Sequence, residues 1–134
     1  MDLFDLAIAS KLSGGGGGGG GDDTLTKLID RTITSLVIPD DVERIGVSAF
    51  ASCAELETVV LHENVKSIAN YAFQNCTKLM SITSRATDPP SLLGSGSLSS
   101  VPANCNIYVP ADSVDAYKAA NRWSARASYI QAIP

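Results

Sequence analysis

The sequence predicts an α/β solenoid: a short stack of repeated coils with about four parallel strands and helical caps at its ends. Two observations predict this fold. Segments 36–59 and 59–82 align without a gap, so that matching residues lie 23 positions apart. Within each segment, apolar residues two apart precede apolar residues three and four apart, the pattern of a strand followed by a short helix. Because one such unit cannot bury its apolar face alone, the coils must stack.

Each coil begins with a strand. Leu36 and Ile38 are two positions apart, which places both side chains on one face of the first strand. Val59 and Leu61 repeat this pair one coil later, and Ile82 begins the next repeat. The parallel order of the strands follows, because every coil must return to the same edge before the next one starts.

The period continues past the two clear repeats. Adding 23 to Ile82, Ser84 and Ala86 gives apolar positions within 104–110, which predicts a fourth strand in the same register. The intervening coil, 87–103, keeps its length but loses the repeat motif. We expect an irregular loop there. The residues expected to cover the core from this loop are Leu92, Leu93, Leu98 and Val101.

A buried helical stripe is predicted in the second half of each coil, where apolar residues recur at steps of three and four. The small alanine permits close approach to the sheet, and the phenylalanine fills the wider interior. Cys53 and Cys76 occupy the same repeat position and are predicted to be buried free thiols. A disulfide or a metal site between them stays open as an alternative. The stripe of the first coil consists of Ile45, Ala49, Phe50, Cys53 and Leu56.

The ends of the stack need covering, because an end coil otherwise exposes its apolar face. The segment 111–122 follows Pro110 and has helical spacing, which predicts a capping helix, with Trp123 and Ile130 closing the core. At the other end, Asp23 or Thr24 is expected to cap a short helix. The apolar residues of that helix are Leu25, Leu28 and Ile29.

The motif IPDDVERIGVSAFASCAEL, residues 38–56, resembles the BspA-like leucine-rich repeats of bacterial, protozoal and phage-associated proteins. The resemblance covers about residues 24–134. It implies a short right-handed solenoid that binds other proteins at cell or particle surfaces, and it implies no catalytic residues. Two departures are the small number of full repeats and the absence of a visible export signal.

The histidine, serine and acidic residues of the sequence form no catalytic motif. The net charge is −4 and the cationic residues are scattered, so we expect no nucleic-acid partner. His62 is the single histidine, and no serine lies in a nucleophile motif. The acidic pairs at 22–23 and 40–41 lack the spacing of a calcium loop. We therefore expect no enzyme activity, no cofactor and no metal.

The strand residues that alternate with the core set form a candidate protein-binding face. Their small and hydroxyl-bearing side chains suit a sheet surface, and solenoids commonly bind partners through such a face. An ordinary solvated sheet surface is the alternative that stays open. The candidate residues are Ser35, Val37, Thr58, Val60, His62, Ser81, Thr83, Arg85, Asn104, Asn106 and Tyr108, with His62, Arg85 and Tyr108 along one side.

The segment 1–21 lies outside the repeat. Its second part, 14–21, is all glycine, which predicts a flexible linker, with an ordered polyglycine strand as the alternative. Ahead of it, 1–13 is predicted to be an apolar docking peptide that a second copy or a larger partner covers, and 22–134 is the repeat domain. A disordered start or a misread signal or anchor stays open. The candidate docking residues are Leu3, Phe4, Ile8 and Leu12.

Two functions follow from this organisation. The docking peptide and linker, and no other part of the chain, resemble the attachment segments of some phage or prophage particle proteins. We therefore expect a non-enzymatic particle or receptor-facing domain that is made in the cytoplasm. The alternative is a bacterial surface or secreted adhesion module. No apolar run approaches the length that spans a bilayer, about 18 residues or more, and the acidic start does not match a secretory signal.

Overall fold

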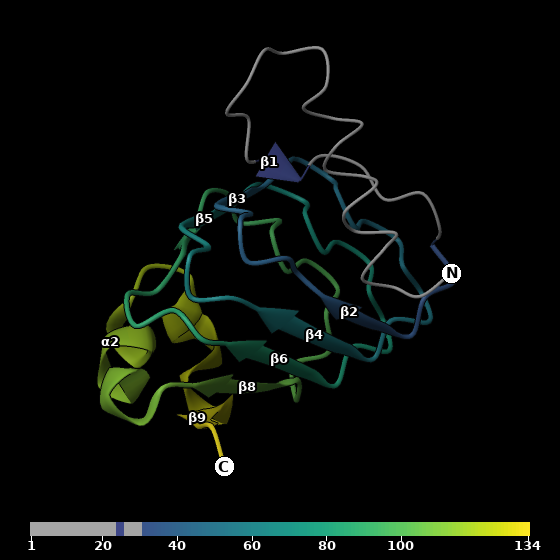
Figure 1. The fold of residues 1–134 in the computed structure, drawn as a ribbon. Coiled ribbons are helices and arrows are strands. Elements are labelled where there is room, and N and C mark those ends of the chain that lie inside the picture. The colour runs from purple at the N-terminus through teal and green to yellow at the C-terminus, as the bar shows by residue number, and fades with distance from the viewer. Residues whose placement is uncertain (1–23, 26–30) are drawn as a thin grey trace.

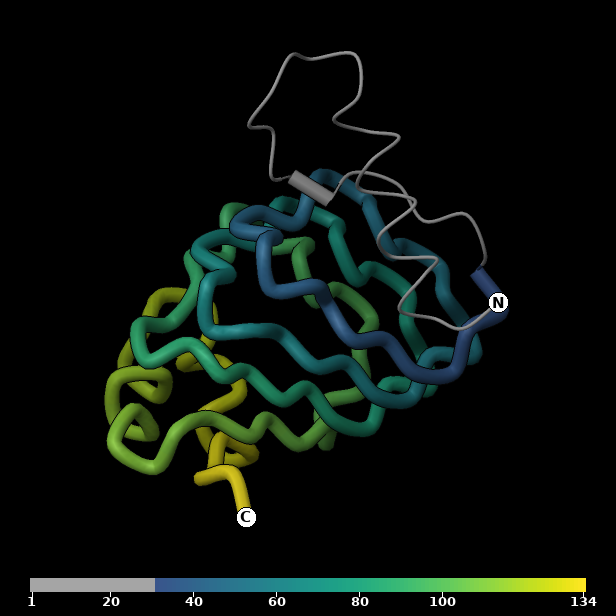
Figure 2. The backbone as a smooth tube through the Cα atoms, in the orientation of Figure 1, coloured from purple at the N-terminus to yellow at the C-terminus, as the bar shows by residue number. Residues whose placement is uncertain are grey.

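The computed structural model describes residues 24–25 and 31–134, and these form a stack of coils with parallel strands (Figure 1). Two sheets line the stack. The larger sheet has the order β2-β4-β6-β8-β9, and the smaller one has the order β1-β3-β5-β7. Each of the first four coils therefore contributes one strand to each sheet, and β9 adds a fifth strand to the larger one. Figure 2 follows the chain from one coil into the next. This is a repeat solenoid, as the sequence predicts.

The larger sheet contains the predicted strands and one more. Its members are β2 (Ser35–Val37), β4 (Thr58–Leu61), β6 (Ser81–Ser84), β8 (Asn106–Val109) and β9 (Ile130–Ala132), all paired in parallel. The smaller sheet consists of very short strands that the sequence analysis did not predict. They are β1 (Thr24–Leu25), β3 (Arg44–Ile45), β5 (Ser67–Ile68) and β7 (Ser91–Leu92).

The register of the strands shows where the repeat lengthens. Ser35 lies opposite Thr58 and Thr58 opposite Ser81, so the partners are 23 positions apart in both pairs. Ser81 then lies opposite Asn106, a step of 25. The fourth strand therefore exists, but its predicted register is wrong by two positions. In the smaller sheet Ser67 lies opposite Ser91, a step of 24. One of the two additional residues thus precedes β7 and the other follows it.

The predicted helix between Ile45 and Leu56 is wrong, because this segment consists of successive turns. Ser48 and Ser52 have φ values of 57° and 60°, which no α-helix contains, and the next coil repeats such values at the equivalent positions. The backbone bonds between coils instead of along a helix: the Phe50 N–H donates to the Ala72 carbonyl at 2.8 Å. These turns form a third side of the stack, beside the two sheets.

The core runs through the centre of the stack and consists of the repeated apolar positions. Phe50 and Phe73 stack with their ring centroids 5.4 Å apart and their planes 13° apart, and both side chains are fully buried. The alanine before each phenylalanine is buried as well. Phe50 and Phe73 occupy the same repeat position, so the two rings contact each other across the boundary between their coils.

The described thiols, Cys53, Cys76 and Cys105, are buried and free, which confirms the free-thiol interpretation of Cys53 and Cys76. The Cys76 thiol donates to the Phe50 carbonyl at 3.2 Å. Its hydrogen bond with Cys53, followed by burial, raises the pKa of Cys76. Burial raises the pKa of Cys105 from 9.0 to about 11. All three act as small core side chains, and the raised pKa values of Cys76 and Cys105 keep these two protonated near neutral pH.

The fourth coil is more regular than predicted. Its β7 pairs with β5, and three of the four residues expected in the core, Leu92, Leu98 and Val101, are buried. Leu93 is wrongly placed by the prediction, because it is 59% exposed. A Cβ on Gly94 would collide with the Asn70 side chain, so the glycine permits this coil to approach the preceding one closely.

The C-terminal end is covered by a short helix, two 3₁₀ segments and β9. These are η1 (Ala111–Ser113), α2 (Val114–Ala119) and η2 (Trp123–Tyr129). The predicted continuous helix over 111–122 is thus too long, because the backbone becomes extended at Ala120. Trp123 and Ile130 are buried, as predicted.

Hydrogen bonds attach this end to the loop after β6. The Trp123 indole N–H donates to the Pro90 carbonyl at 2.7 Å, and the Tyr117 hydroxyl donates to the Ala86 carbonyl at 2.6 Å. The Ser84 hydroxyl lies 2.7 Å from the same tyrosine oxygen. The rings of Tyr117 and Trp123 meet edge to face with centroids 5.3 Å apart. Each buried polar tip in this cluster therefore has a partner.

At the N-terminal end, Thr24 and Leu25 form strand β1. The prediction that Leu25 belongs to a short helix capped by Asp23 or Thr24 is therefore wrong. Leu28 and Ile29 lie outside the described residues. The predicted docking peptide, with Leu3, Phe4, Ile8 and Leu12, and the glycine linker lie outside them too. The boundary at residue 22 stays a prediction.

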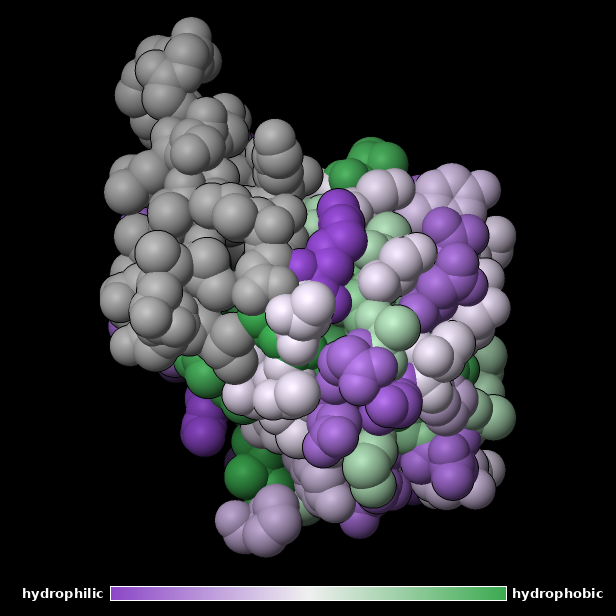
Figure 3. All heavy atoms as spheres, turned by 90° about the vertical axis from the view of Figure 1, so that its right-hand side faces the viewer, coloured by the Kyte–Doolittle hydropathy of each residue, from purple (hydrophilic) through white to green (hydrophobic). Residues whose placement is uncertain are grey.

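Ion pairs connect neighbouring coils on the surface. Lys66 pairs with Glu43 at 3.2 Å, Lys78 with Glu55 at 2.9 Å, and the His62 Nδ1 lies 2.8 Å from an Asp40 oxygen. In each of these pairs the acidic residue belongs to the earlier coil and the basic residue to the later one. Figure 3 looks onto a side where apolar (green) residues form only small patches among polar ones.

Raising the pH above about 9 is expected to destabilise the fold. Burial raises the pKa of Tyr117 from 10.0 to about 12, in the same direction as the shift of Cys105. Both groups are neutral when protonated, and the folded state binds these protons more tightly than the unfolded state does. Their contribution to stability is therefore complete below pH 9 and is lost between about pH 9 and 12, at no more than roughly 2–3 kcal/mol for each group.

Urea unfolding between pH 8 and 11.5 measures this loss. Tyr117→Phe should flatten the part of the curve above pH 10, whereas Tyr71→Phe, at a tyrosine that is 42% exposed, should leave the curve unchanged. An unfolding free energy that stays constant over the whole range would contradict the expectation.

Candidate protein-binding face

The outer face of the larger sheet consists of two rows of side chains that cross the strands. The strands alternate between buried and more exposed residues, so every second side chain points away from the core. We name row one by its residues Ser35, Thr58, Ser81 and Asn106. Row two consists of Val37, Val60, Thr83, Tyr108 and Gln131.

The two rows carry no formal charge, and their members are exposed or half-buried. Hydroxyl and amide groups make up row one, whereas β-branched side chains occupy most of row two. Gln131 extends row two onto β9, and its Nε2 donates to the Asn106 Oδ1 at 3.1 Å. Gln131 could not be predicted from the sequence, because a strand of three residues with one buried side chain gives no periodic signal.

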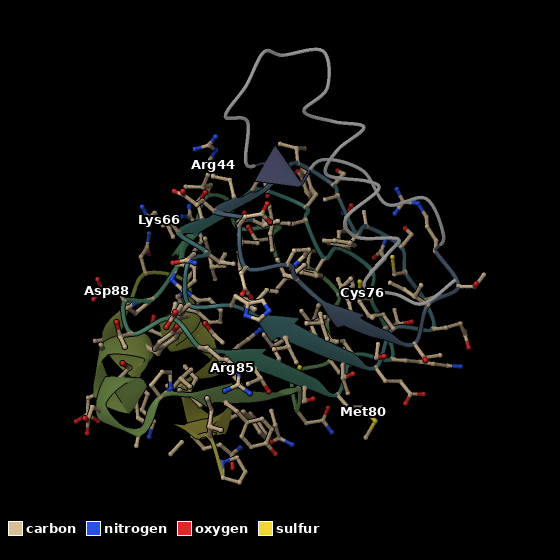
Figure 4. All side chains as sticks on the ribbon, in the orientation of Figure 1. Arg44, Lys66, Cys76, Met80, Arg85 and Asp88 are labelled. Carbon is tan, nitrogen blue, oxygen red and sulfur yellow. The ribbon has the colours of Figure 1, made fainter. Side chains whose placement is uncertain are left out.

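Charged groups lie beyond the carboxyl ends of the strands. His62 follows β4 and pairs with Asp40, while Arg85 follows β6 and occupies the repeat position of His62 one coil later. Figure 4 shows Arg85 over the sheet, with Met80 at the opposite end of the same strand. Tyr108 was expected beside these two residues, and that placement is wrong: it lies in row two, opposite Thr83. The lengthening of the fourth coil by two positions accounts for the difference.

Asn104 is the second predicted face residue that lies elsewhere in the structure. It precedes β8 and lines a hollow of about 270 Å³ beside the strand starts, together with Met80 and Pro102. Met80 is 64% exposed and was not predicted as a surface residue of interest. Met80 occupies the repeat position that Glu57 has in the preceding coil. An apolar residue in place of a charged one was therefore the only sequence signal for Met80.

The side chains of the two rows are available for surface contacts. The residues that the structure describes contain no group of three or more His, Cys, Asp or Glu side chains that could hold a metal ion. In the same part of the chain, no helix has the length and apolar character needed to cross a membrane. What the face presents is a set of hydroxyl, amide and β-branched groups.

A family model described as BspA type leucine-rich repeat region (6 copies) matches residues 29–112. The chain belongs to the BspA-type leucine-rich repeat family. The matched region extends from the segment before β2 to the 3₁₀ turn after β8, so it contains every residue of row one. Gln131, on β9, lies beyond it. A comparison with curated proteins gives no match.

BspA-type repeats are protein-interaction modules, and this membership agrees with the coil stack in the structure. The first three strands of the larger sheet follow the repeat in register. Their outward residues were therefore correctly placed by sequence alone. Asn106 and Tyr108 of β8 were assigned to the correct face of the sheet but to the wrong row.

Proposed function

We propose that this BspA-type chain is a non-enzymatic binding module that holds a protein partner against rows one and two. The observation that carries the proposal is the exposed, uncharged face that five parallel strands present. A face of this kind loses little side-chain entropy when it is covered, because β-branched and hydroxyl side chains have few rotamers.

The size of the face argues for binding in several copies. The strands are short and give a narrow surface, and small interfaces belong to weak or transient complexes. Linked copies convert a weak contact into a strong one without any new contact. A particle or a cell surface that displays many copies would supply this multiplicity.

We further propose that the chain is tethered to a phage- or prophage-like particle by its N-terminal segment. The support is compositional: an apolar segment, residues 1–13, is joined to the repeat region by a run of glycines, 14–21. An adhesion module on a bacterial surface is the second candidate, and membership in a family of protein-interaction repeats is compatible with it.

Affinity capture with matched variants tests the binding face. Val60→Lys places a charge in the centre of row two, where it should abolish capture of the partner by the full chain. Ser67→Lys places the same charge on the smaller sheet, at a half-buried position of β5, and should leave capture intact. Equal capture by both variants would remove the proposed face. A partner from particle proteins or from cell-surface proteins would separate the two candidates.

A further inference from the structure

A groove follows the seam between the fourth coil and the C-terminal segment. It consists of two hollows of about 260 and 310 Å³, and Leu92 and Arg122 line both of them. Leu98 and Ala125 contribute apolar surface to one hollow, and Pro89 to the other. We call this feature the seam groove. It lies away from rows one and two, on residues that the binding proposal does not use.

The charged residues that line the seam groove are positive. Arg122 and Arg126 lie four positions apart on the C-terminal segment, and no described residue that lines either hollow is acidic. Neither arginine forms an ion pair within the described part of the chain. The lining of the groove is therefore positive, whereas the net charge of the chain is −4.

Backbone carbonyls hold both guanidinium groups in place. Arg126 donates to the carbonyls of Leu98, Val101 and Pro102 at 2.8–3.2 Å, and it is half-buried. Arg122 donates one bond, to the Leu92 carbonyl at 3.0 Å, and is otherwise exposed. Since a guanidinium has five N–H donors, Arg122 retains donors in a fixed position for an acidic group.

The same chain contains a segment with the complementary chemistry. Residues 2–6 read Asp-Leu-Phe-Asp-Leu, which places two carboxylates among three large apolar side chains. The apolar side chains need burial and the carboxylates need cations. The seam groove offers apolar walls beside two arginines that have no acidic partner among the described residues.

The seam groove and the strand that follows the glycine run lie at opposite edges of the smaller sheet. Strand β1 (Figure 1), which follows the glycine run in the sequence, is one edge strand of the smaller sheet. The other edge strand is β7, and its Leu92 lines the seam groove. A segment from one copy that enters the groove of the next joins copies head to tail. Such a contact is heterologous, and it builds a ring or an open chain of copies.

We propose that the seam groove binds residues 2–6 of a second copy, with Asp5 of that segment at Arg122. This inference uses a different surface from rows one and two, so its failure would leave the binding-face proposal standing. It gives the N-terminal segment a defined binding site and supplies the multiple copies that a weak binding face requires.

A charge exchange in the full chain tests the proposal. Light scattering and sedimentation velocity over a range of concentrations should show self-association of the wild type that weakens in about 0.5 M NaCl, because salt screens exposed charge pairs. Arg122→Glu and Asp5→Arg should each weaken association by about tenfold or more, since each places like charges together. The double variant should recover association to within about threefold of wild type. Lys118→Glu, an exposed lysine on α2 outside the groove, is the matched control and should have no effect.

A competition experiment keeps the test valid if Arg122→Glu perturbs the fold. The synthetic peptide MDLFDLAIASKL should dissociate wild-type assemblies, and the same peptide with Asp5→Arg should not. A full chain that stays monomeric, a double variant without rescue, or an Arg122→Glu variant that behaves like Lys118→Glu would each overturn the proposal.

Discussion

Phe73→Ala is expected to destabilise the fold by about 3–5 kcal/mol, the usual cost of emptying a buried aromatic site. Phe73 is 1% exposed and stacks on Phe50 at 5.4 Å, so the substitution removes a ring and also exposes the face of its neighbour to a cavity. Total stabilities of small domains are about 5–15 kcal/mol. Urea unfolding of the full chain should therefore show a much lower midpoint.

Phe73→Leu tests whether the stability depends on the filled volume of this site. Leucine keeps most of the volume, so this variant should lose much less stability than the alanine variant. Met80→Ala, at a side chain that is 64% exposed, is the surface control and should be close to neutral. An alanine variant as stable as the wild type would show that the coils do not stack through this ring.

Trp123→Ala should be the second severe substitution, also at about 3–5 kcal/mol. Trp123 is 1% exposed, packs edge to face on Tyr117 and donates its indole N–H to the Pro90 carbonyl. Its loss leaves a large cavity and a buried carbonyl without this partner. The C-terminal segment would then cover the fourth coil poorly, and hydrogen exchange should increase in β9 more than in β4.

Trp123→Phe measures the hydrogen bond apart from the ring. Phenylalanine retains much of the packing but cannot donate to Pro90, so we expect a loss of about 1–3 kcal/mol, the range for an unsatisfied buried acceptor. If β9 and β4 lose protection equally in the alanine variant, the end of the stack and its centre unfold as one unit. The local role of Trp123 in holding the C-terminal segment would then be refuted.

The stacked core could be predicted from the sequence because spacing alone determines it. Leu36, Val59 and Ile82 occupy one repeat position, and all three are buried in neighbouring strands. Spacing alone could not show that successive turns, and not a helix, follow each strand. Successive turns also bring every third or fourth side chain inward, and the residues that distinguish them, Ser48 and Ser52, are not glycines. Their left-handed backbone leaves no clear sequence signal.

The register of the fourth coil and the seam groove could not be predicted from the sequence either. Two additional residues in a stretch rich in glycine and serine shift β8 by two positions, and this moves Tyr108 and Asn104 away from their predicted neighbours. The apolar residues there are too few to fix the register. The seam groove depends on contacts between residues about 30 positions apart, such as Arg122 with Leu92. Those contacts follow from the complete fold and from no local pattern.

The direction of the ion pairs between coils bears on how such a chain grows by gene duplication. Each pair places an acid on the earlier coil beside a base on the later one, as in Glu43 with Lys66 and Glu55 with Lys78. A tandem duplication of the coil that carries both lysines would set each lysine above its own copy, one strand spacing away. Such a duplication would replace two attractive pairs by two repulsive ones, whereas duplication of both coils together keeps acid facing base. Lengthening in steps of two coils is therefore the route that preserves the ion pairs of this surface.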